Sequence, residues 1–523
     1  MDQGGTLGNV PSCLTSGPSP ANIGLPMRND IRVALVTPEA APFAKSGELA
    51  EFCGSLPRYL SSLGLKISLI MPKYGTPQIA SLDATAVFPD IPIPLNGERA
   101  KASILRAEQK GYDIYLVDSP KYFLRENIYG PPTGNYLDND ERFIFFSRAA
   151  LEFLRRADLS PDIVHCHNWP TALIPVFLRS HYREDPGLKS AAAVLTLHNT
   201  AYQGEFPAES LALTELSWDF LNPHSHTSNG KINFLQAGAA YADFVNTVSA
   251  VCEKELLARK NRSGLSGVLR KRRRTFTSVG NGIDRETWDP QTDPYIAANF
   301  GPGQFAGKAE CRRDLAAVMG LVPRAEKPLA AFVSHLSRHK GADILAQSLE
   351  AIVSLGAAVV ICGEGEERFR KEFQTASRRF PGQVAFRFES SPVLMHKIIA
   401  GADILLLPSL SEPSGLNLFA AFRYGTVPVV RATGGLKEAV RAHNSKKGTG
   451  NGFVFHDYTA QALIRAVGQA ADCYTGKPAQ WRKLEEEGMG EQFSWGDTAR
   501  GYADLYQKAL AIKRGGSTGH GSC

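Results

Sequence analysis

The feature that most constrains the fold is a buried strand followed by a loop, an amphipathic helix and a second buried strand. Residues 31–37 (IRVALVT) are an apolar run of strand length. Apolar side chains then recur at helical spacing over 48–63, Gly64 can end that helix, and residues 65–72 (LKISLIMP) are a second apolar run. Two strands joined through a helix form a parallel βαβ unit, so the sequence predicts an α/β fold from residue 31 onward.

The same cycle recurs along the chain and starts again in the second half. Further apolar strands are predicted at 163–167, 192–198 and 244–249 in the first half, and at 328–336, 357–365, 403–410 and 427–435 in the second. Two successive cycles predict two doubly wound domains with a cleft between them. Ligands of such sheets bind beyond the C-terminal ends of the strands, so we expect the active site in the loops that follow them.

Length and composition exclude several classes of protein. A chain of 523 residues suggests two or more domains, and its 43% of hydrophobic residues excludes a wholly disordered chain. No apolar stretch approaches the roughly 18 to 20 residues that cross a bilayer, so we expect no membrane span. The eight cysteines form no Cys-x-x-Cys pair, which argues against a zinc module and a disulfide framework. This usage of cysteine favours a reducing compartment.

The first 30 residues differ in composition from the rest of the chain. They are rich in Gly, Ser, Pro and Asn and lack the charged and apolar regions of a secretion signal. We expect a disordered extension over 1–30, and a protein of the bacterial cytoplasm or the plastid stroma.

The most informative segment carries an acidic residue and two glycines after two successive strands. Glu412 lies in the loop after one strand, and Pro413 suits the first turn of the next helix. The following strand leads to Thr433, Gly434 and Gly435 at the start of another helix. Gly-rich backbone at a helix N-terminus offers N–H donors for phosphate, although a plain tight turn would look the same. The Glu412 carboxylate could hold sugar hydroxyls, or could be a helix cap.

Taken together, the motifs of this chain resemble those of the bacterial glycogen synthases and plant starch synthases. The matching stretches, in order, are KSGELAEFCGSLPRYLSSLG (45–64), YLDNDERFIFFSRAALE (136–152), HCHNW (165–169), LHNTAYQGEFP (197–207), GKINFLQAGAAYAD (230–243), GNGIDRETWDPQTDPY (280–295), SHLSRHKGAD (334–343), PSLSEPSGL (408–416), RYGTVPVVRATGGLKEAV (423–440) and FSW (493–495). The resemblance implies the α/β GT-B fold, in which two Rossmann-like domains face an interdomain cleft. It implies the following division: an N-terminal acceptor domain over 31–265, a C-terminal nucleotide-sugar domain over 275–490, a helix over 491–512 that returns to the N-terminal domain, and a flexible tail over 513–523.

The resemblance also implies an activity. Members of the family transfer glucose from ADP-glucose or UDP-glucose to the non-reducing end of an α-1,4-glucan, with retention and without a metal or other cofactor. Departure of the nucleotide diphosphate leaves an oxocarbenium-like sugar, so cations and N–H donors must stabilise charge on the leaving phosphate.

Individual residues take their expected roles from the family pattern. Lys45 and Lys340 should reach the diphosphate, Glu412 should hold the donor glucose, and His198 should lie near the reacting sugar. His335, at the position of a family arginine, is expected to act in catalysis together with Glu412, Lys340 and His198. The remaining nucleotide-sugar contacts are expected from Gly47, Asn168, Thr433, Gly434 and Gly435.

Several positions depart from the family pattern, and four of them belong to the expected site. Glu48 replaces a glycine where backbone approaches phosphate closely, and Asn168 replaces an acid. His335 replaces an arginine that forks onto the diphosphate, a geometry that a mostly neutral histidine cannot reproduce. Ser390 stands where an aromatic side chain stacks on the nucleoside base.

These departures leave several functions open. The chain is a synthase of the family type, a specialised glycosyltransferase with another acceptor, or a catalytically impaired glucan-binding or regulatory protein. The retained lysines, Glu412 and the Thr-Gly-Gly turn favour an enzyme. An NAD-dependent oxidoreductase is disfavoured because no Gly-x-Gly-x-x-Gly follows the first strand.

The net charge says little about partners. Lys and Arg number 58 and Asp and Glu 52, but the run RKRRR (270–274) supplies five of the positive charges and the remaining balance is 53 to 52. No aromatic residues interleave with that run, so nucleic acid is not an expected partner. The expected partners are the nucleotide-sugar donor and the glycosyl acceptor.

Overall fold

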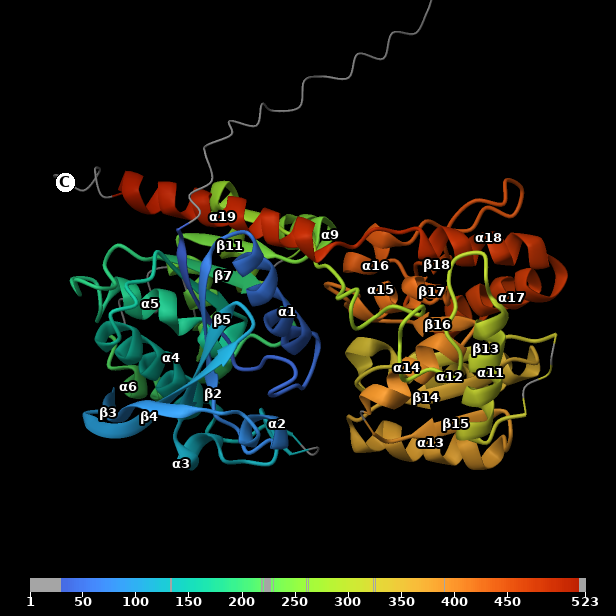
Figure 1. Ribbon diagram of the computed structural model, residues 1–523, viewed down its shortest axis with the longest axis horizontal. Helices are drawn as coiled ribbons and strands as arrows, with labels where there is room; N and C mark the ends of the chain where they lie inside the picture. Colours follow the sequence, from blue (N-terminus) through green and yellow to red (C-terminus); the bar gives the residue numbers. More distant parts are fainter. Residues whose placement is uncertain are drawn as a thin grey trace, which may run out of the picture.

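The computed structural model describes most of the chain as two α/β domains side by side (Figure 1). The described residues are 30–131, 134–217, 220, 227–228, 230–259, 261, 263–322, 324, 326–389 and 391–516. The extension expected over 1–30, apart from Asp30, lies outside them, as do Ser390 and residues 517–523 of the expected tail.

A nine-stranded sheet forms the centre of the N-terminal domain. Its strands, in spatial order, are β12 (Phe276–Ser278), β11 (Phe244–Thr247), β7 (Ala192–Leu197), β6 (Ile163–His167), β1 (Arg32–Val36), β2 (Lys66–Pro72), β5 (Tyr112–Asp118), β4 (Glu98–Gln109) and β3 (Thr85–Leu95). The strands from β12 to β5 are parallel, whereas β4 and β3 run antiparallel at one edge. All five strands predicted in the first half are present, and β3, β4, β5 and β12 were not predicted.

One boundary differs from the expectation. The N-terminal sheet does not end before 265, because β12 pairs in parallel with β11, with Val245 opposite Phe276. The chain therefore leaves this domain after Ser278, inside the region assigned from the sequence to the C-terminal domain.

Helices cover the N-terminal sheet. The longer ones are α1 (Glu48–Ser62), α4 (Asn139–Arg156), α5 (Leu173–Arg179), α8 (Phe234–Tyr241), α9 (Ala250–Leu257) and α10 (Gly264–Lys271), and the short ones are α2 (Pro77–Ala80), α3 (Pro120–Phe123) and α6 (Leu211–Thr214). A small second sheet orders β8 (Glu205–Pro207), β10 (Lys231–Asn233) and β9 (Thr227–Ser228). The basic run lies at the end of α10, where Arg272 donates to the carbonyls of Ala240 and Ala242 and so closes the end of α8.

A six-stranded parallel sheet forms the C-terminal domain. Its order is β15 (Val384–Arg387), β14 (Ala358–Cys362), β13 (Leu329–Val333), β16 (Ile404–Leu407), β17 (Val427–Arg431) and β18 (Phe453–Phe455). Its helices are α11 (Ala306–Met319), α12 (Ala342–Ser354), α13 (Glu367–Arg379), α14 (Pro392–Gly401), α15 (Leu416–Arg423), α16 (Gly434–Ala439), α17 (Ala460–Gly476) and α18 (Pro478–Met489). Alternate residues of a strand enter opposite faces: Ala331 packs in one apolar core and Ala330 in the other. Helix α15 begins at Leu416, so Pro413 lies in the loop and not in the first helical turn.

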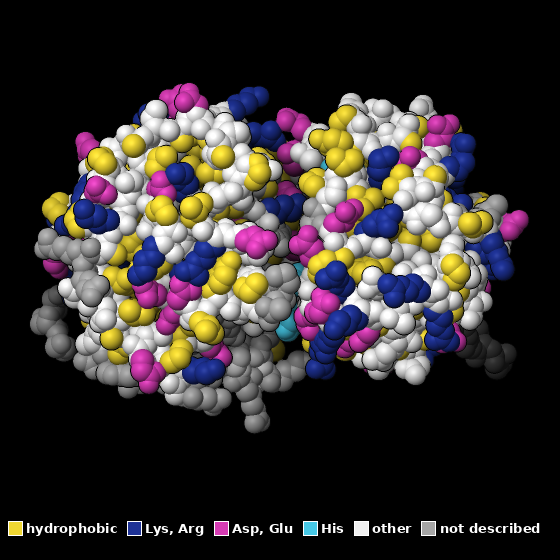
Figure 2. Space-filling view, turned by 90° about the horizontal axis from the view of Figure 1, so that it is seen from below, with side chains coloured by type: hydrophobic (Ala, Val, Ile, Leu, Met, Phe, Trp, Pro, Cys, Tyr) yellow, Lys and Arg dark blue, Asp and Glu magenta, His cyan; other side chains and the backbone are white. Residues whose placement is uncertain are grey.

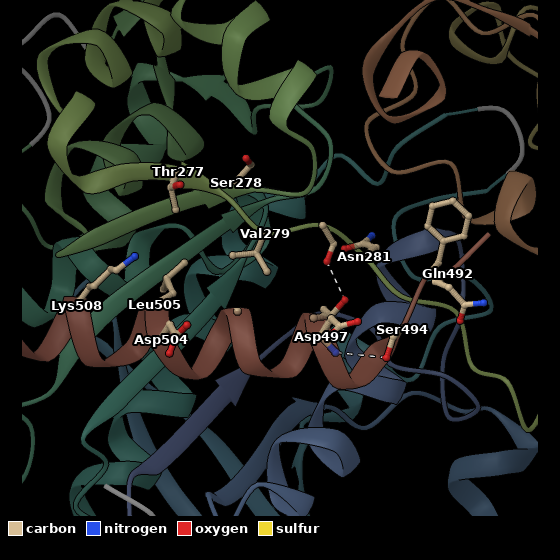
Figure 3. A pocket seen from close by; sticks show the side chains of 14 residues that line it. Thr277, Ser278, Val279, Asn281, Gln492, Ser494, Asp497, Asp504, Leu505 and Lys508 are labelled. Carbon is tan, nitrogen blue, oxygen red and sulfur yellow. Dashed lines mark hydrogen bonds between the residues drawn. The ribbon is translucent and has the colours of Figure 1, made fainter. Parts of the chain in front are cut away.

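The chain crosses between the domains twice. Beyond α18 it returns as α19 (Trp495–Gly516), whose Trp495, Tyr502 and Tyr506 join the N-terminal core. Figure 1 shows this helix in red along the N-terminal domain. The two crossings lie side by side, because the Ile283 N–H donates to the Phe493 carbonyl at 3.1 Å. A groove of about 430 Å³ opens beside them, between the segment after β12 and the start of α19 (Figure 3).

None of the helices that the structure describes is both long and apolar enough to cross a membrane.

Candidate active site between the domains

The candidate site lies where loops from both domains meet. Figure 2 shows the two lobes joining along a furrow in which histidine side chains are visible. The N-terminal domain contributes the start of α1 and the loops after β6 and β7, and the C-terminal domain contributes the loops after β13, β16 and β17. This is the edge at which parallel strands present their C-terminal ends, as the sequence predicts.

Lys340 and Glu412 form an ion pair at the centre of this region. Lys340 ends a short 3₁₀ turn (Arg338–Lys340) after β13, and its Nζ lies 2.7 Å from Oε1 of Glu412 in the loop after β16. The Ser409 hydroxyl donates to the other Glu412 oxygen at 2.9 Å. The Glu412 side chain is only 3% exposed, so its charge depends on these partners.

Glu48, the first residue of α1, reaches across from the other domain to the same lysine. Its Oε1 lies 3.0 Å from Lys340 Nζ, and its Oε2 accepts a hydrogen bond from the Ser414 hydroxyl. The Glu48 side chain is 29% exposed and that of Lys340 is 24% exposed. The Lys340 ammonium therefore pairs with two carboxylates, and the cluster of Lys340, Glu48 and Glu412 carries a net negative charge when both carboxyl groups are ionised.

The two carboxyl groups respond to this arrangement in opposite directions. Burial raises the pKa of Glu412 to about 7, and the charge of Glu48 adds to the effect. Burial also works to raise the pKa of Glu48, but the Lys340 charge and the hydrogen bond from Ser414 outweigh it and lower it to about 2. Lys340 stays protonated, because the two carboxylates raise its pKa despite burial. Near neutral pH Glu412 is therefore the carboxyl group that exchanges a proton, whereas Glu48 stays ionised.

The Thr-Gly-Gly turn positions the Glu412 loop. Thr433 is the N-cap residue of α16, and Gly434 has a φ of +47°. A Cβ on Gly434 would lie 2.1 Å from the Glu412 carbonyl oxygen, so only glycine fits there. The N–H of Gly435 donates to that same carbonyl at 3.0 Å. The N–H that the sequence predicts for phosphate binding at Gly435 is thus engaged within the loop in this structure.

Three histidines form a buried row behind the cleft. His165 and His167 lie in β6, and His198 follows β7, with its Nε2 3.1 Å from Nδ1 of His167. Burial lowers the pKa of His198 to about 3, so its imidazole is neutral at pH 7. Its ring packs edge-on against Phe52 of α1, with 4.5 Å between the ring centroids. A neutral imidazole can exchange hydrogen bonds with sugar hydroxyls without bringing charge into the site.

Asn168 holds the His198 loop in place. Its Oδ1 accepts the N–H of His198 at 2.8 Å and the N–H of Asn199 at 3.2 Å. Its own backbone has a φ of +55° and a ψ of −169°, outside the left-handed helical region that asparagine favours, so this position is strained. The amide oxygen makes bonds that a carboxylate would also make, so the loss of the family acid leaves this support intact.

The other residues predicted from the sequence differ in whether they interact with Lys340. The ammonium of Lys45 pairs with Glu51 on α1 and not with the Lys340 cluster. Gly47 is the N-cap residue of α1, directly before Glu48, and a Cβ there would meet open space. His335 follows β13, and burial of its ring, together with the Lys340 charge, lowers its pKa. The Lys340 charge therefore acts on His335, whereas Lys45 is paired with Glu51.

Several residues of the site carried no recognisable signal in the sequence. Ser414 anchors Glu48, and buried Glu39 accepts the N–H and the hydroxyl of Ser46 at 2.6 and 2.7 Å, which holds the loop before α1. Glu438 accepts the Ser249 hydroxyl at 2.8 Å and the Ala250 N–H at 3.0 Å, so a C-terminal-domain carboxylate caps α9 of the other domain. The contacts of Glu48 with Ser414 and of Glu438 with Ser249 join segments distant in sequence, which no local pattern reveals.

Among the described residues, no group of three or more His, Cys, Asp or Glu side chains is arranged to hold a metal ion.

Comparisons with known proteins agree with this geometry. Residues 32–271 match the family model of the starch synthase catalytic domain, and residues 320–486 match that of the glycosyl transferases group 1. The glycogen synthase of Koribacter versatilis is 39% identical over 484 residues, which are 92% of this chain and 99% of that protein. The chain belongs to the glycogen synthase family. The glycogen synthase of Moorella thermoacetica is 36% identical over 491 residues, 93% of this chain and 99% of that protein.

Solved structures extend the family relationship to three dimensions. The catalytic domain of starch synthase IV from Arabidopsis thaliana, bound to ADP and acarbose, has a TM-score of 0.85 at 29% identity and covers 92% of this chain and 99% of its own. Sucrose-phosphate synthase from Thermosynechococcus elongatus, at 16% identity and a TM-score of 0.59, shares the fold. The resemblance and the GT-B fold predicted from the sequence are confirmed, and this family member is a glycosyltransferase of the glycogen synthase type.

Proposed function

We propose that this glycogen synthase family member transfers glucose from ADP-glucose or UDP-glucose to the non-reducing end of an α-1,4-glucan, with retention. The observation that carries the proposal is the Lys340–Glu412 pair at the meeting of the two domains. It puts a permanent cation beside a nearly buried carboxyl group, which suits a leaving diphosphate next to a sugar. The related starch synthase IV structure, which holds ADP and acarbose, supports both the donor and the acceptor class.

Each group has a role that follows from its state. Lys340 takes up negative charge as the nucleotide diphosphate leaves, because its ammonium is held by carboxylates that raise its pKa. Glu412 orients hydroxyls of the donor glucose, and with a pKa of about 7 it can donate as well as accept a hydrogen bond. His198 contacts the reacting sugar as a neutral imidazole. Asn168 and the Thr433–Gly435 turn act indirectly, by holding the His198 and Glu412 loops.

An assay of glucose transfer tests this function. The purified chain is incubated with radiolabelled ADP-glucose or UDP-glucose and with glycogen or a maltooligosaccharide primer, and the new linkage is checked by NMR for the α anomer. Lys340→Ala and Glu412→Ala should each lower the rate by about 10² to 10³, the usual cost of losing one preorganised group. Glu350→Gln, an exposed carboxylate on α12, is the matched control and should leave the rate unchanged. Absence of transfer from both donors would overturn the proposal.

A second candidate is a protein that binds glucan without turnover. It is favoured by one observation, the occupation of Lys340 by Glu48. Affinity gel electrophoresis in glycogen separates the two candidates, since retarded migration without any glucose transfer belongs only to the second.

A further inference from the structure

Both lysines expected to bind the donor diphosphate are already neutralised by the first turn of α1. Glu48 contacts Lys340 at 3.0 Å, and Glu51, three residues later on the same helix, pairs with Lys45. Glu48 stands where the family has glycine, so its carboxylate is an added negative charge at this position. We propose that Glu48 is an affinity-determining residue of the donor site, whose carboxylate takes the place of a donor phosphate on Lys340 and must leave before a nucleotide sugar binds. This inference rests on the proposed function.

The contacts of Glu48 point away from its own helix. A carboxylate in the first helical turn is stabilised by the helix dipole and often caps the backbone N–H groups. Glu48 instead extends to the C-terminal domain, where the Lys340 ammonium and the Ser414 hydroxyl each take one of its two oxygens. A pair of oxygens held by an ammonium and a hydroxyl is also how a protein binds one face of a phosphate. The Glu48 carboxylate thus occupies the contacts that a donor phosphate would make.

Charge makes simultaneous occupation unfavourable. With Glu48 and Glu412 both on Lys340, the site offers no surplus positive charge to a diphosphate, which would add further negative charge within a few ångströms. His335, where an arginine would have supplied a cation, is neutral at pH 7. Glu48 therefore has to move out of contact for the diphosphate to be neutralised.

The arrangement of the domains allows that movement. Glu48 and Lys340 belong to different domains, which are joined by two crossings that meet at Ile283 and Phe493. A groove lies beside these crossings, where Asn281 and Thr498 line its wall (Figure 3). Separating the domains by a small rotation at the crossings would break the Glu48 contacts without disturbing either sheet.

The energetic consequence is a weakened apparent affinity. When only a fraction of molecules has a free Lys340, the apparent Kd for the donor rises by the inverse of that fraction. If the state with Glu48 on Lys340 is favoured by about ten to one, the apparent Kd for the donor rises about tenfold. Removing the charge of Glu48 should therefore lower the apparent Kd by the same factor.

Isothermal titration of the full chain with ADP, and in parallel with UDP, tests the inference. Glu48→Gln should bind ADP about tenfold more tightly than the wild type. Ser414→Ala, which removes one anchor of Glu48 and leaves the charges unchanged, should shift the Kd in the same direction by less. Glu286→Gln is the matched control, since it removes another interdomain ion pair, that with Arg58 at 2.8 Å, away from Lys340. Its Kd should equal that of the wild type.

The outcomes separate this inference from the proposed function. If wild type and Glu48→Gln bind ADP equally, or Glu48→Gln binds it more weakly, Glu48 does not compete with the donor, although the function stands. If none of the proteins binds ADP or UDP, the donor site itself is wrong and the inference falls with it. A melting curve of each variant establishes folding, and Ser414→Ala keeps the test decisive if Glu48→Gln does not fold.

Discussion

The phenol oxygen of Tyr506 lies 2.9 Å from Nδ1 of His165 in the interior of the N-terminal domain. The other ring nitrogen lies 2.6 Å from the Thr196 hydroxyl, which donates its own hydrogen to Oδ1 of Asn246. Nε2 of His165 must therefore carry the proton, and Nδ1 accepts the hydrogen bond from Tyr506. This series of hydrogen bonds joins α19, which arrives from the C-terminal domain, to β6, β7 and β11.

Tyr506→Phe should destabilise the chain by about 1 to 3 kcal/mol, because it leaves the buried Nδ1 of His165 without a donor. Thermal or urea unfolding of the variant measures the loss. Tyr202→Phe, at a tyrosine that is 51% exposed, is the control and should be neutral. Equal stability of Tyr506→Phe and wild type would show that the bond contributes nothing.

Gly434→Ala should lower glucose transfer by about 10² or more, since a misplaced reacting group commonly costs that much. The added Cβ would meet the Glu412 carbonyl oxygen at 2.1 Å, at a φ of +47° that alanine adopts poorly, and would push the Glu412 loop away from Lys340. Steady-state kinetics with the donor varied provide the measurement. Gly267→Ala on α10, whose Cβ would meet nothing within 4 Å, should keep wild-type kinetics. A fully active Gly434→Ala would contradict the assigned role of the turn.

Glu412→Gln should change how stability depends on pH. The pKa of Glu412 is raised from 4.5 in the unfolded chain to about 7 in the fold, so between these values the folded state binds more protons. The contribution of Glu412 to stability is therefore largest at low pH and is lost as pH rises toward 7. Glu48, with its pKa lowered to about 2, contributes fully above 4.5 and loses its contribution progressively as the pH falls from 4.5 to about 2.

The difference in unfolding free energy between wild type and Glu412→Gln, measured from about pH 5 to about pH 8, isolates this group. Relative to the wild type, the variant should gain stability as pH rises. Glu485, whose pKa is also raised to about 7, is present in both proteins and cancels in the difference. A difference that does not vary with pH would refute the raised pKa of Glu412.

His335→Arg should lower the KM for the sugar nucleotide by about tenfold, the equivalent of one added charge-assisted hydrogen bond of modest strength. The guanidinium would stand beside Lys340 and provide the forked donor that histidine lacks. His456→Arg, at an exposed histidine, adds the same charge elsewhere and should leave KM unchanged. An unaltered KM for His335→Arg would mean that this position does not face the diphosphate.

Local sequence was sufficient for most of the buried parallel strands, although β5, β12, β15 and β18 were missed. Continuous apolar runs such as β1, β2 and β6 are buried on both faces of a sheet, so their assignment needs no knowledge of distant partners. The motifs around Glu412 and Gly434 predicted the fold family and the edge of the sheet at which the site lies. The edge strands were missed for a physical reason. Strand β3 (TAVFPDIPIPL) contains three prolines and is largely exposed along its first half, which is tolerated only at an edge.

The tertiary structure decided which charges meet. Glu48 and Lys340 are 292 residues apart, and His165 and Tyr506 are 341 residues apart. Hydrophobic periodicity specifies what is buried, but a polar side chain finds its partner only when the domains are packed together. The sequence by itself determined the family, the two sheets and the residues available for chemistry. Only the folded chain paired both expected phosphate-binding lysines with glutamates of α1, because side-chain electrostatics acts over a few ångströms in space and not along the chain.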